Sequence, residues 1–354
     1  MKFNFSRFLI TGGCGFIGSS LVRNLIKRNN ISIINIDKMT YASNILAVEK
    51  TNHLYTHYKK DINDINFLRN IINDFNPDCL IHFAAESHVD RSIDNPSEFI
   101  ETNIVGTYNL LNTTYAYWRE LNKKNKDRFR FMHISTDEVY GDAYQLPSFD
   151  EESPFLPNSP YAASKASSDL LVRSWNKTYN FPSIITSASN NYGKWQFPEK
   201  LIPLTIKKAL LGEKIPIYGD GSQIRNWLNV EDHIEGIINV LSKGKVGERY
   251  NLASSTELTN LEVVETICKT LDALAPSENG LKYSELITYV KDRPGHDKRY
   301  SLDITKIKNE LDWLPKKSFK EGIYETVEWY LNNKDWLFNK TKEKYDGRRL
   351  GQLK

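Results

Sequence analysis

The chain has 354 residues, of which 40% are hydrophobic and 26% are charged, and its formal net charge is +3. This balance is typical of a soluble globular protein. The length favours one large α/β domain with a smaller lobe, because a single core rarely grows to this size.

The charge and cysteine patterns exclude several classes of protein. Lysines and arginines are scattered rather than clustered, which argues against nucleic acid, whereas the mild positive balance suits a small anionic substrate. The three cysteines, Cys14, Cys79 and Cys268, have no paired spacing, so neither a disulfide framework nor a zinc site is expected. The first residues lead straight into a strand pattern, so no secretory segment is expected, and no apolar run reaches the length of a membrane span. We therefore expect a cytoplasmic protein without nucleic-acid, membrane or metal partners.

The N-terminal residues predict a dinucleotide-binding unit. A short apolar strand over residues 8–11 is followed by Gly12-x-x-Gly15-x-x-Gly18 and then by a helical pattern. The glycines let the backbone approach a diphosphate, and the helix N-terminus presents free N–H groups to it. Asp37 ends the next apolar strand, where its carboxylate can accept hydrogen bonds from a ribose diol and would repel a 2′-phosphate. The pattern therefore favours NAD over NADP.

The chain then alternates between strands and helices, with further strands expected over residues 54–59, 79–83, 131–135 and 183–187. Such alternation predicts an α/β fold with a Rossmann-type, doubly wound parallel sheet, whose ligands bind at the carboxyl ends of the strands. Asp61 follows the third strand, where it either flanks an adenine or caps a loop. His88 follows the fourth strand and, with no second metal ligand nearby in sequence, is expected to have a structural role. Residues 122–130 are expected to form a charged loop.

Two long helices are expected in this domain, over residues 99–118 and 161–179. The first carries an aromatic stripe at helical spacing, which indicates a core or subunit contact rather than a cofactor site. Beyond residue 187 short strands and helices mix, and we place a smaller C-terminal α/β substrate lobe there. The expected domains are therefore residues 1–187, joined by some later segments, and residues 188–354.

The residues that most suggest chemistry lie near the fifth strand and the helix after it. Tyr161 and Lys165 are four residues apart, so a helix places the phenol and the ammonium on one face, where the cation can lower the pKa of the phenol. Asp137 and Glu138 follow the fifth strand at the ligand-binding edge of the sheet. A redox base beside a carboxylate pair suggests an oxidation coupled to an elimination. Taken alone, each pair is also compatible with an ordinary surface pair.

These residues resemble a known family. Thr11-Gly12-x-x-Gly15-x-x-Gly18 with Tyr161-x-x-x-Lys165 is similar to the extended short-chain dehydrogenase/reductases. Longer strings narrow the resemblance to the dTDP-glucose 4,6-dehydratase family, namely Asp37-Lys-Met-Thr-Tyr-Ala42, Ala84-Ala-Glu-Ser-His-Val-Asp-Arg91, Ser135-Thr-Asp-Glu-Val-Tyr-Gly141, Ser189-Asn-Asn-Tyr-Gly193 and Phe197-Pro-Glu-Lys-Leu-Ile-Pro203. The most specific element is the trio Thr136-Asp137-Glu138, because sugar epimerases of the superfamily lack the carboxylate pair.

The resemblance implies NAD as the cofactor, dTDP-glucose as the substrate, and a set of residues for each. Around NAD it places Gly12, Gly15, Phe16, Ile17, Gly18, Asp37, Lys38, Thr40, Asp61, Ile62, Phe83, Ala84, Ala85, Ser87, Thr102, Tyr161, Lys165 and Asn191. Around the nucleotide sugar it places Ser87, Thr136, Asn190, Glu199, Lys200, Leu201, Pro216, Tyr218, Arg225, Asn260, Arg293 and His296. The two arginines also fit on physical grounds, because a guanidinium can bind a diphosphate through two parallel hydrogen bonds.

The resemblance also implies a reaction catalysed by Thr136, Asp137, Glu138, Tyr161 and Lys165. Tyr161 takes the proton of the sugar 4-hydroxyl as C4 is oxidised, and Thr136 positions the 4-oxygen. Glu138 then removes the C5 proton and Asp137 protonates the departing 6-hydroxyl, so Asp137 must start neutral with a raised pKa. The product is dTDP-4-keto-6-deoxyglucose, which makes the protein an NAD-dependent hydro-lyase. A homodimer is implied as well, through the helices over residues 99–118 and 162–179.

Three departures from the family pattern flank the predicted pocket, at Ser187-Ala188, Lys194-Trp195 and Asn226-Trp-Leu-Asn229. They leave UDP-glucose open as an alternative substrate. A nucleotide-sugar 4-epimerase or decarboxylase is a second alternative, since it needs Tyr161 and Lys165 but not both carboxylates. The third is a non-catalytic nicotinamide-binding regulator, against which the intact tyrosine and lysine argue.

Overall fold

The computed structural model describes residues 5–28, 30–48, 53–341 and 350–351. Its centre is a seven-stranded sheet in the order β10-β6-β5-β4-β1-β2-β3, in which every neighbouring pair is parallel. The strands are β1 (Arg7–Thr11), β2 (Ser32–Asp37), β3 (Tyr55–Lys59), β4 (Cys79–His82), β5 (Arg130–Thr136), β6 (Ser183–Ala188) and β10 (Arg249–Leu252). This confirms the predicted Rossmann-type sheet, and the strands called β1 to β6 end within one residue of their predicted positions.

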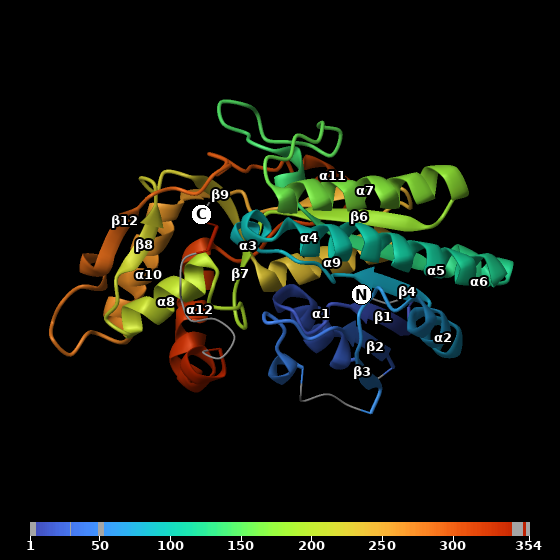
Figure 1. Cartoon of the computed structure of the whole chain (residues 1–354), viewed down its shortest axis with the longest axis horizontal. Helices are drawn as coiled ribbons and strands as arrows, with labels where there is room; N and C mark the ends of the chain where they lie inside the picture. Colours follow the sequence, from blue (N-terminus) through green and yellow to red (C-terminus); the bar gives the residue numbers. More distant parts are fainter. Residues whose placement is uncertain (1–4, 29, 49–52, 342–349, 352–354) are drawn as a thin grey trace.

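Helices cover both faces of this sheet (Figure 1). One face packs on α2 (Ile65–Phe75), α5 (Thr107–Glu120) and α7 (Pro160–Tyr179), and the other on α1 (Phe16–Ile26), α9 (Val230–Lys243) and α11 (Thr305–Leu311). Successive side chains of a strand point to opposite faces. Thus Leu9 of β1 belongs to the first core, whereas Phe8 and Ile10 belong to the second. Both faces of the sheet are buried, which explains the continuous apolar runs in the sequence.

The order of the strands fixes where a ligand can bind. From β1 the chain builds β2 and β3 on one side and β4, β5 and β6 on the other. The direction of winding therefore reverses between β1 and β4. At such a switch point the loops after neighbouring strands separate and leave a crevice at the carboxyl edge of the sheet.

The C-terminal part lies beside the sheet (Figure 1) and has a hydrophobic core of its own, in addition to the two on the faces of the sheet. A three-stranded sheet contains β7 (Asn190–Tyr192), β9 (Ile224–Asn229) and β11 (Glu257–Thr259), and β8 (Ile215–Tyr218) pairs with β12 (Ile287–Val290). They pack with α8 (Leu201–Leu210), α10 (Asn260–Leu274) and α12 (Phe319–Asn332). The boundary at residue 188 stays a prediction, and from beyond it α9 and β10 contribute to the main sheet and its core.

Two predicted segments differ from the structure. The helix expected over residues 99–118 is divided into α4 (Pro96–Phe99), a wider π-helical turn (Ile100–Gly106) and α5. The prediction of a charged loop over residues 122–130 was wrong, because this segment contains the short helix α6 (Lys123–Arg128). The Asn122 side chain caps this helix by accepting a hydrogen bond from the N–H of Asn125, at 3.0 Å. A polar cap starts α6, so hydrophobic periodicity gave no signal for it.

The remaining short elements are α3 (Val89–Asp94), η1 (Ile45–Ala47), η3 (Asp137–Tyr140), η4 (Tyr283–Leu286) and η5 (Trp336–Lys340). Within the described ranges, none of the helices combines the length and the apolar character needed to cross a bilayer.

Candidate active site

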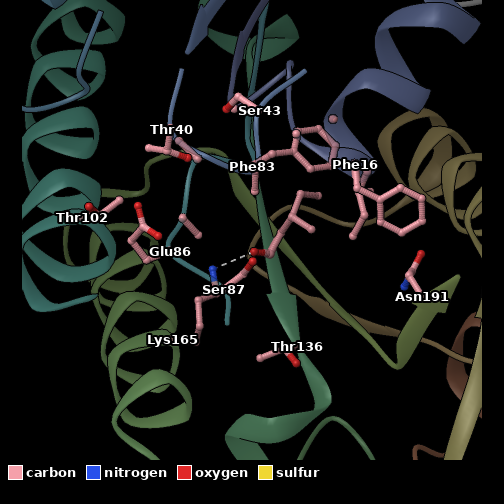
Figure 2. A pocket seen from close by; sticks show the side chains of 18 of the residues that line it. Phe16, Thr40, Ser43, Phe83, Glu86, Ser87, Thr102, Thr136, Lys165 and Asn191 are labelled. Carbon is pink, nitrogen blue, oxygen red and sulfur yellow. Dashed lines mark hydrogen bonds between the residues drawn. The ribbon is translucent and has the colours of Figure 1, made fainter. Parts of the chain in front are cut away.

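A cavity of about 300 Å³ opens at the switch point of the sheet. It is lined by every residue predicted to contact the cofactor and by all five residues predicted to be catalytic. In Figure 2, Phe16 and Asn191 lie on one side of it, and Thr40, Glu86 and Thr102 on the other. The loops after β1, β2, β4, β5 and β6 therefore meet around one space, as the sequence predicts for the carboxyl edge of a parallel sheet.

The glycine turn after β1 is packed too closely for side chains. A Cβ at Gly12, where φ is +73°, would lie 2.6 Å from the backbone nitrogen of Ala84, and one at Gly18 would lie 2.3 Å from the carbonyl oxygen of Gly12. The helix α1 then begins at Phe16 without a side-chain cap at Gly15. Its first N–H groups are thus available to an anion, and this cradle fits the diphosphate of a dinucleotide.

Asp37, at the end of β2, holds the glycine turn in place. Its Oδ2 accepts a hydrogen bond from the N–H of Cys14 at 2.9 Å, and its Oδ1 accepts bonds from Met39 N and Ser43 Oγ at 2.8 Å each. A carboxylate oxygen can accept two bonds, so Oδ2 retains capacity for a further donor, such as a ribose hydroxyl. The same side chain can therefore order the loop and line the cavity.

Asp61 and His88 both form local contacts. Asp61 lines the cavity, while its Oδ1 accepts a hydrogen bond from Asn63 N at 2.9 Å, so both positions considered for it are compatible with the structure. His88 caps α3 by accepting a bond from Arg91 N at 3.4 Å. Burial lowers the pKa of His88 well below its usual range and keeps it neutral. Across the described residues, no group of His, Cys, Asp and Glu is arranged to hold a metal ion.

The carboxylate pair lies where β5 ends. Thr136 Oγ1 accepts a bond from Glu138 N at 3.3 Å, and the 3₁₀ turn η3 begins at Asp137. Because the turn ends the alternation of a strand, both acids line the cavity. Asp137 is 3% exposed, and its Oδ2 has no hydrogen-bond partner among the described residues.

The two acids have different electrostatic surroundings. Burial, and secondly the charge of Glu138, raise the pKa of Asp137 to about 7. Burial also raises the pKa of Glu138, but Arg293, Lys200 and Arg225 all lower it. The direction for Asp137 is the one that a general acid requires, because it must carry a proton near neutral pH.

Tyr161 and Lys165 lie in the first two turns of α7, with Ser159 as the helix cap. Burial raises the pKa of Tyr161 well above its usual range, Glu138 raises it further, and the Thr136 hydroxyl lowers it. Lys165 Nζ donates a hydrogen bond to a carbonyl of β5, Ile134 O, at 2.8 Å (dashed in Figure 2). The lowering of the phenol pKa by this ammonium stays a prediction.

Five of the residues predicted to bind the nucleotide sugar line the cavity, namely Ser87, Thr136, Asn190, Glu199 and Lys200. Four more form a cluster of rings and cations, namely Tyr218, Arg225, Arg293 and His296. Within this cluster, the ring centroids of Tyr218 and His296 are 6.4 Å apart. Neither this cluster nor the remaining three residues line the cavity: Leu201 begins α8, Pro216 lies in β8 and Asn260 begins α10.

Both arginines of the cluster are held by contacts to neighbouring residues, Arg225 in a buried position and Arg293 in a partly buried one. Arg225 donates to Asp297 O at 2.9 Å and lies over the ring of Tyr300, 4.0 Å from its centroid. Arg293 Nη1 donates to Asp90 Oδ1 at 2.7 Å, and its buried Nε has no partner among the described residues. Such an N–H group suits an incoming anion, because a buried donor without a partner is costly.

Sequence reasoning missed two neighbours of the carboxylate pair. The hydroxyl of Tyr300 donates to Asp297 Oδ2 at 2.7 Å and lies 3.4 Å from Glu138 Oε2. Tyr300 is 162 residues away from Glu138, so no local pattern connects them. The cavity also includes residues to which the sequence analysis assigned no ligand: Ile36, Ala42, Ser43, Lys60, Glu86, Ile134, Ser135, Ala188, Ser189, Gln196 and Phe197.

The departures from the family pattern have mainly structural contacts. Asn226 donates to Ser254 O and accepts from Leu302 N, both at 3.2 Å, and Asn229 caps α9. The ring of Trp195 packs on that of Trp329, with 4.7 Å between centroids. Of the six residues Ser187, Ala188, Lys194, Trp195, Asn226 and Asn229, only Ala188 lines the cavity.

Comparisons with known proteins agree with the geometry. The GDP-mannose 4,6 dehydratase family model matches residues 9–326. A dTDP-glucose 4,6-dehydratase of Haemophilus influenzae is 54% identical over 330 residues, covering 92% of this chain and 98% of that protein. The dTDP-glucose 4,6-dehydratase 1 of Escherichia coli K12 is 51% identical over 344 residues, covering 94% and 95%.

Solved structures are similar over almost the whole chain. A dTDP-glucose 4,6-dehydratase from Streptomyces venezuelae, solved with NAD, has a TM-score of 0.85 and 41% identity, covering 95% of this chain and all of that one. A UDP-glucose 4-epimerase from Thermotoga maritima, solved with UDP-glucose, has a TM-score of 0.82 but 26% identity, covering 92% and 99%. The folds are thus equally close, while the sequence is closer to the dehydratase.

The glycine turn gives a first prediction. In Gly18→Ala the new Cβ would press on the carbonyl of Gly12, so the turn must open. We expect dinucleotide binding to weaken about tenfold or more, as overpacking typically costs about 1–3 kcal/mol. Isothermal titration with NAD measures this change. The control is Gly212→Ala, whose Cβ meets open space after α8 and should leave the affinity unchanged. Equal affinities in the two variants would contradict the assignment of the turn.

Proposed function

This chain belongs to the dTDP-glucose 4,6-dehydratase family, and from that premise we propose how its residues carry out the reaction. The enzyme is an NAD-dependent hydro-lyase that converts dTDP-glucose to dTDP-4-keto-6-deoxyglucose, as relatives of about 50% identity over nearly the full length indicate. One observation supports the residue roles above all. The carboxylates of Asp137 and Glu138 line the same cavity as Tyr161 and Lys165.

The cofactor site is formed by residues that the structure already gathers. NAD bound there would supply the redox chemistry, as a reversible hydride acceptor. The glycine turn and the N-terminus of α1 would hold its diphosphate, and Asp37 a ribose. Asp61 and Ile62 would lie beside the adenine, and Tyr161 and Lys165 beside the nicotinamide. The cradle at Gly12, which no Cβ could enter, supports this fit.

For the oxidation, we assign the base to Tyr161. Its Oη takes the proton of the sugar 4-hydroxyl, while Thr136 Oγ1 orients the 4-oxygen. Burial keeps the resting phenol neutral, so a nearby cation is needed to make it a base. Lys165, one turn along α7, is the cation that lines the cavity beside it.

In the elimination, each of the two acids acts on a different atom of the sugar. Glu138 removes the C5 proton, which the new 4-keto group acidifies, and Asp137 gives its proton to the departing 6-hydroxyl. A pKa of about 7 leaves about half of the Asp137 carboxyls protonated at neutral pH, and most of them below it. The cations Arg293, Lys200 and Arg225 favour the ionised form of Glu138. We assign the substrate diphosphate to the two arginines, since guanidinium groups bind it bidentately.

The Glu138→Gln variant tests the division of roles. It should still oxidise C4, seen as transient NADH absorbance, but lose the exchange of the C5 proton, so turnover should fall at least about 100-fold. Incubation with dTDP-glucose in D₂O should then leave C5 almost free of deuterium by NMR. Tyr161→Phe should instead abolish the NADH transient. As a control, Glu152→Gln changes an exposed acid and should behave as wild type. Normal C5 labelling in Glu138→Gln would refute the role of Glu138.

We also infer a homodimer in the cytoplasm. Large apolar side chains are exposed on the π-helical turn, α5 and α7, with exposed fractions of 50% for Ile100, 44% for Tyr108, 54% for Leu170 and 43% for Tyr179. These helices contact each other, and grouped exposed apolar residues are typical of a subunit contact. The three cysteines are free and buried, which suits a reducing compartment.

A charge placed in this surface should separate the subunits. We expect Leu170→Asp to elute as a monomer in size-exclusion chromatography with light scattering, because a dimer would bury the new carboxylate without a partner. Leu156→Asp is the control, since Leu156 is 63% exposed in the loop before α7. A dimer of unchanged stability in Leu170→Asp would rule out this interface.

A further inference from the structure

A buried charged network lies behind Lys165. The helix α7 carries Tyr161, Lys165 and Asp169 at four-residue spacing, so the three side chains follow one face of the helix. Asp169 has an exposed fraction of 0% and does not line the cavity. The reaction scheme above therefore uses the first two residues of this row but not the third.

Three side chains surround the carboxylate of Asp169. Its Oδ2 accepts a hydrogen bond from Ser135 Oγ at 2.7 Å and lies 2.8 Å from Arg249 Nη1, which comes from β10. Its Oδ1 lies 3.1 Å from His133 Nε2. The pKa of Asp169 lies well below its usual range, with Arg249 as the largest influence that opposes burial. An ionised carboxylate therefore persists in a place that water does not reach.

His133 connects this carboxylate to Lys165. Its Nε2 is 3.5 Å from Lys165 Nζ and 3.3 Å from Ser168 Oγ, and its side chain is fully buried. Burial and the charge of Lys165 lower the pKa of His133 to about 4, so the ring is neutral. A neutral imidazole nitrogen either donates or accepts, so Nε2 can accept a hydrogen bond from Lys165 only while it donates none. Asp169 Oδ1 has no hydrogen-bond partner among the described residues, so the carboxylate acts on its surroundings through its charge.

We propose that Asp169 is a positioning residue for the oxidation step, whose buried negative charge beside His133 holds the Lys165 ammonium in place and keeps it charged, and that Arg249 opposes this effect. The proposal rests on the role given to Lys165 above. Lys165 is only 4% exposed, and its other close partner is the neutral carbonyl of Ile134. An ammonium so buried needs a nearby anion to stay protonated.

The charges around Lys165 act in the expected directions. Burial lowers the pKa of Lys165 to about 8, Asp169 raises it and Arg249 lowers it. The groups whose charges act between themselves and Lys165 are Asp169 on α7, His133 on β5, His82 on β4 and Arg249 on β10. Tyr161 on α7, and Asp137 and Glu138 on η3, line the same cavity as Lys165. Both histidines are neutral, because burial lowers the pKa of each. Asp169 is thus the buried anion that supports the charge of Lys165.

The test isolates oxidation from elimination. All variants are made in the Glu138→Gln background, and the rate of NADH appearance with dTDP-glucose is measured by stopped flow against pH. Loss of the Lys165 proton should set the alkaline limb of this profile. In Asp169→Asn the limb should move to lower pH by about 1 unit or more. In Arg249→Gln it should move to higher pH, whereas Arg249→Lys keeps the charge and should leave the limb in place.

A second measurement of the Lys165 protonation state does not depend on turnover. Acetylation of Lys165 by a small anhydride, followed against pH by peptide mass spectrometry, reports the free amine directly and should show the same opposite shifts. If Asp169→Asn does not fold, the double variant Asp169→Asn/Arg249→Gln removes both charges and leaves neither one buried alone. The alkaline limb of this double variant should lie at a lower pH than that of the Glu138→Gln background. The shift should be smaller than the one that Asp169→Asn alone produces.

The outcomes separate this inference from the proposed function. The inference predicts that the alkaline limb moves in opposite directions in Asp169→Asn and Arg249→Gln, which a purely structural role would not produce. Limbs that stay in place, or that move in the same direction, would overturn it. If the wild-type enzyme forms no dehydrated product from dTDP-glucose, the proposed function fails, whatever the variants do.

Discussion

The active site depends on how strand β5 ends. Thr136 is the last residue of the strand, and its hydroxyl accepts a hydrogen bond from the backbone of Glu138, which starts a 3₁₀ turn. Had the strand continued, Asp137 and Glu138 would point to opposite faces of the sheet. The turn brings both carboxylates to the cavity that Tyr161 lines. One local backbone feature thus allows an acid, a base and a phenol to act on a single sugar.

Burial then differentiates groups that are chemically alike. Asp137 and Glu138 are adjacent carboxyls, yet burial and its neighbour raise the pKa of Asp137 to about 7, while three cations act against the same rise at Glu138. Burial lowers the pKa of Lys165 to about 8, where a single nearby charge decides its protonation. The pKa values of Asp137 and Lys165 therefore lie close to neutral pH, where each group can both give and take a proton.

Much of the fold and the cavity could be predicted from local signals. Buried parallel strands are apolar runs, and the glycine turn and Asp37 line one cavity at the edge of the sheet, where the sequence pattern predicts a crevice. The Tyr161–Lys165 spacing and the acids after β5 are local as well. Contacts that join distant segments could not be predicted. Tyr300 reaches Glu138 across 162 residues, and the partners of Asp169 come from two strands, β5 and β10. Hydrophobic periodicity also gives no signal for a helix that begins at a polar cap and has no apolar face, as α6 does.

The convergence of these residues around one hexose is tested most directly by following a hydrogen atom. The enzyme is incubated with dTDP-glucose that carries deuterium at C4, and the product is analysed by mass spectrometry and NMR. We predict a product lighter than the substrate by one molecule of water, with the deuterium now at C6. A product of unchanged mass, or a dehydrated product whose deuterium has been lost to the solvent, would contradict a single site that oxidises, eliminates and reduces.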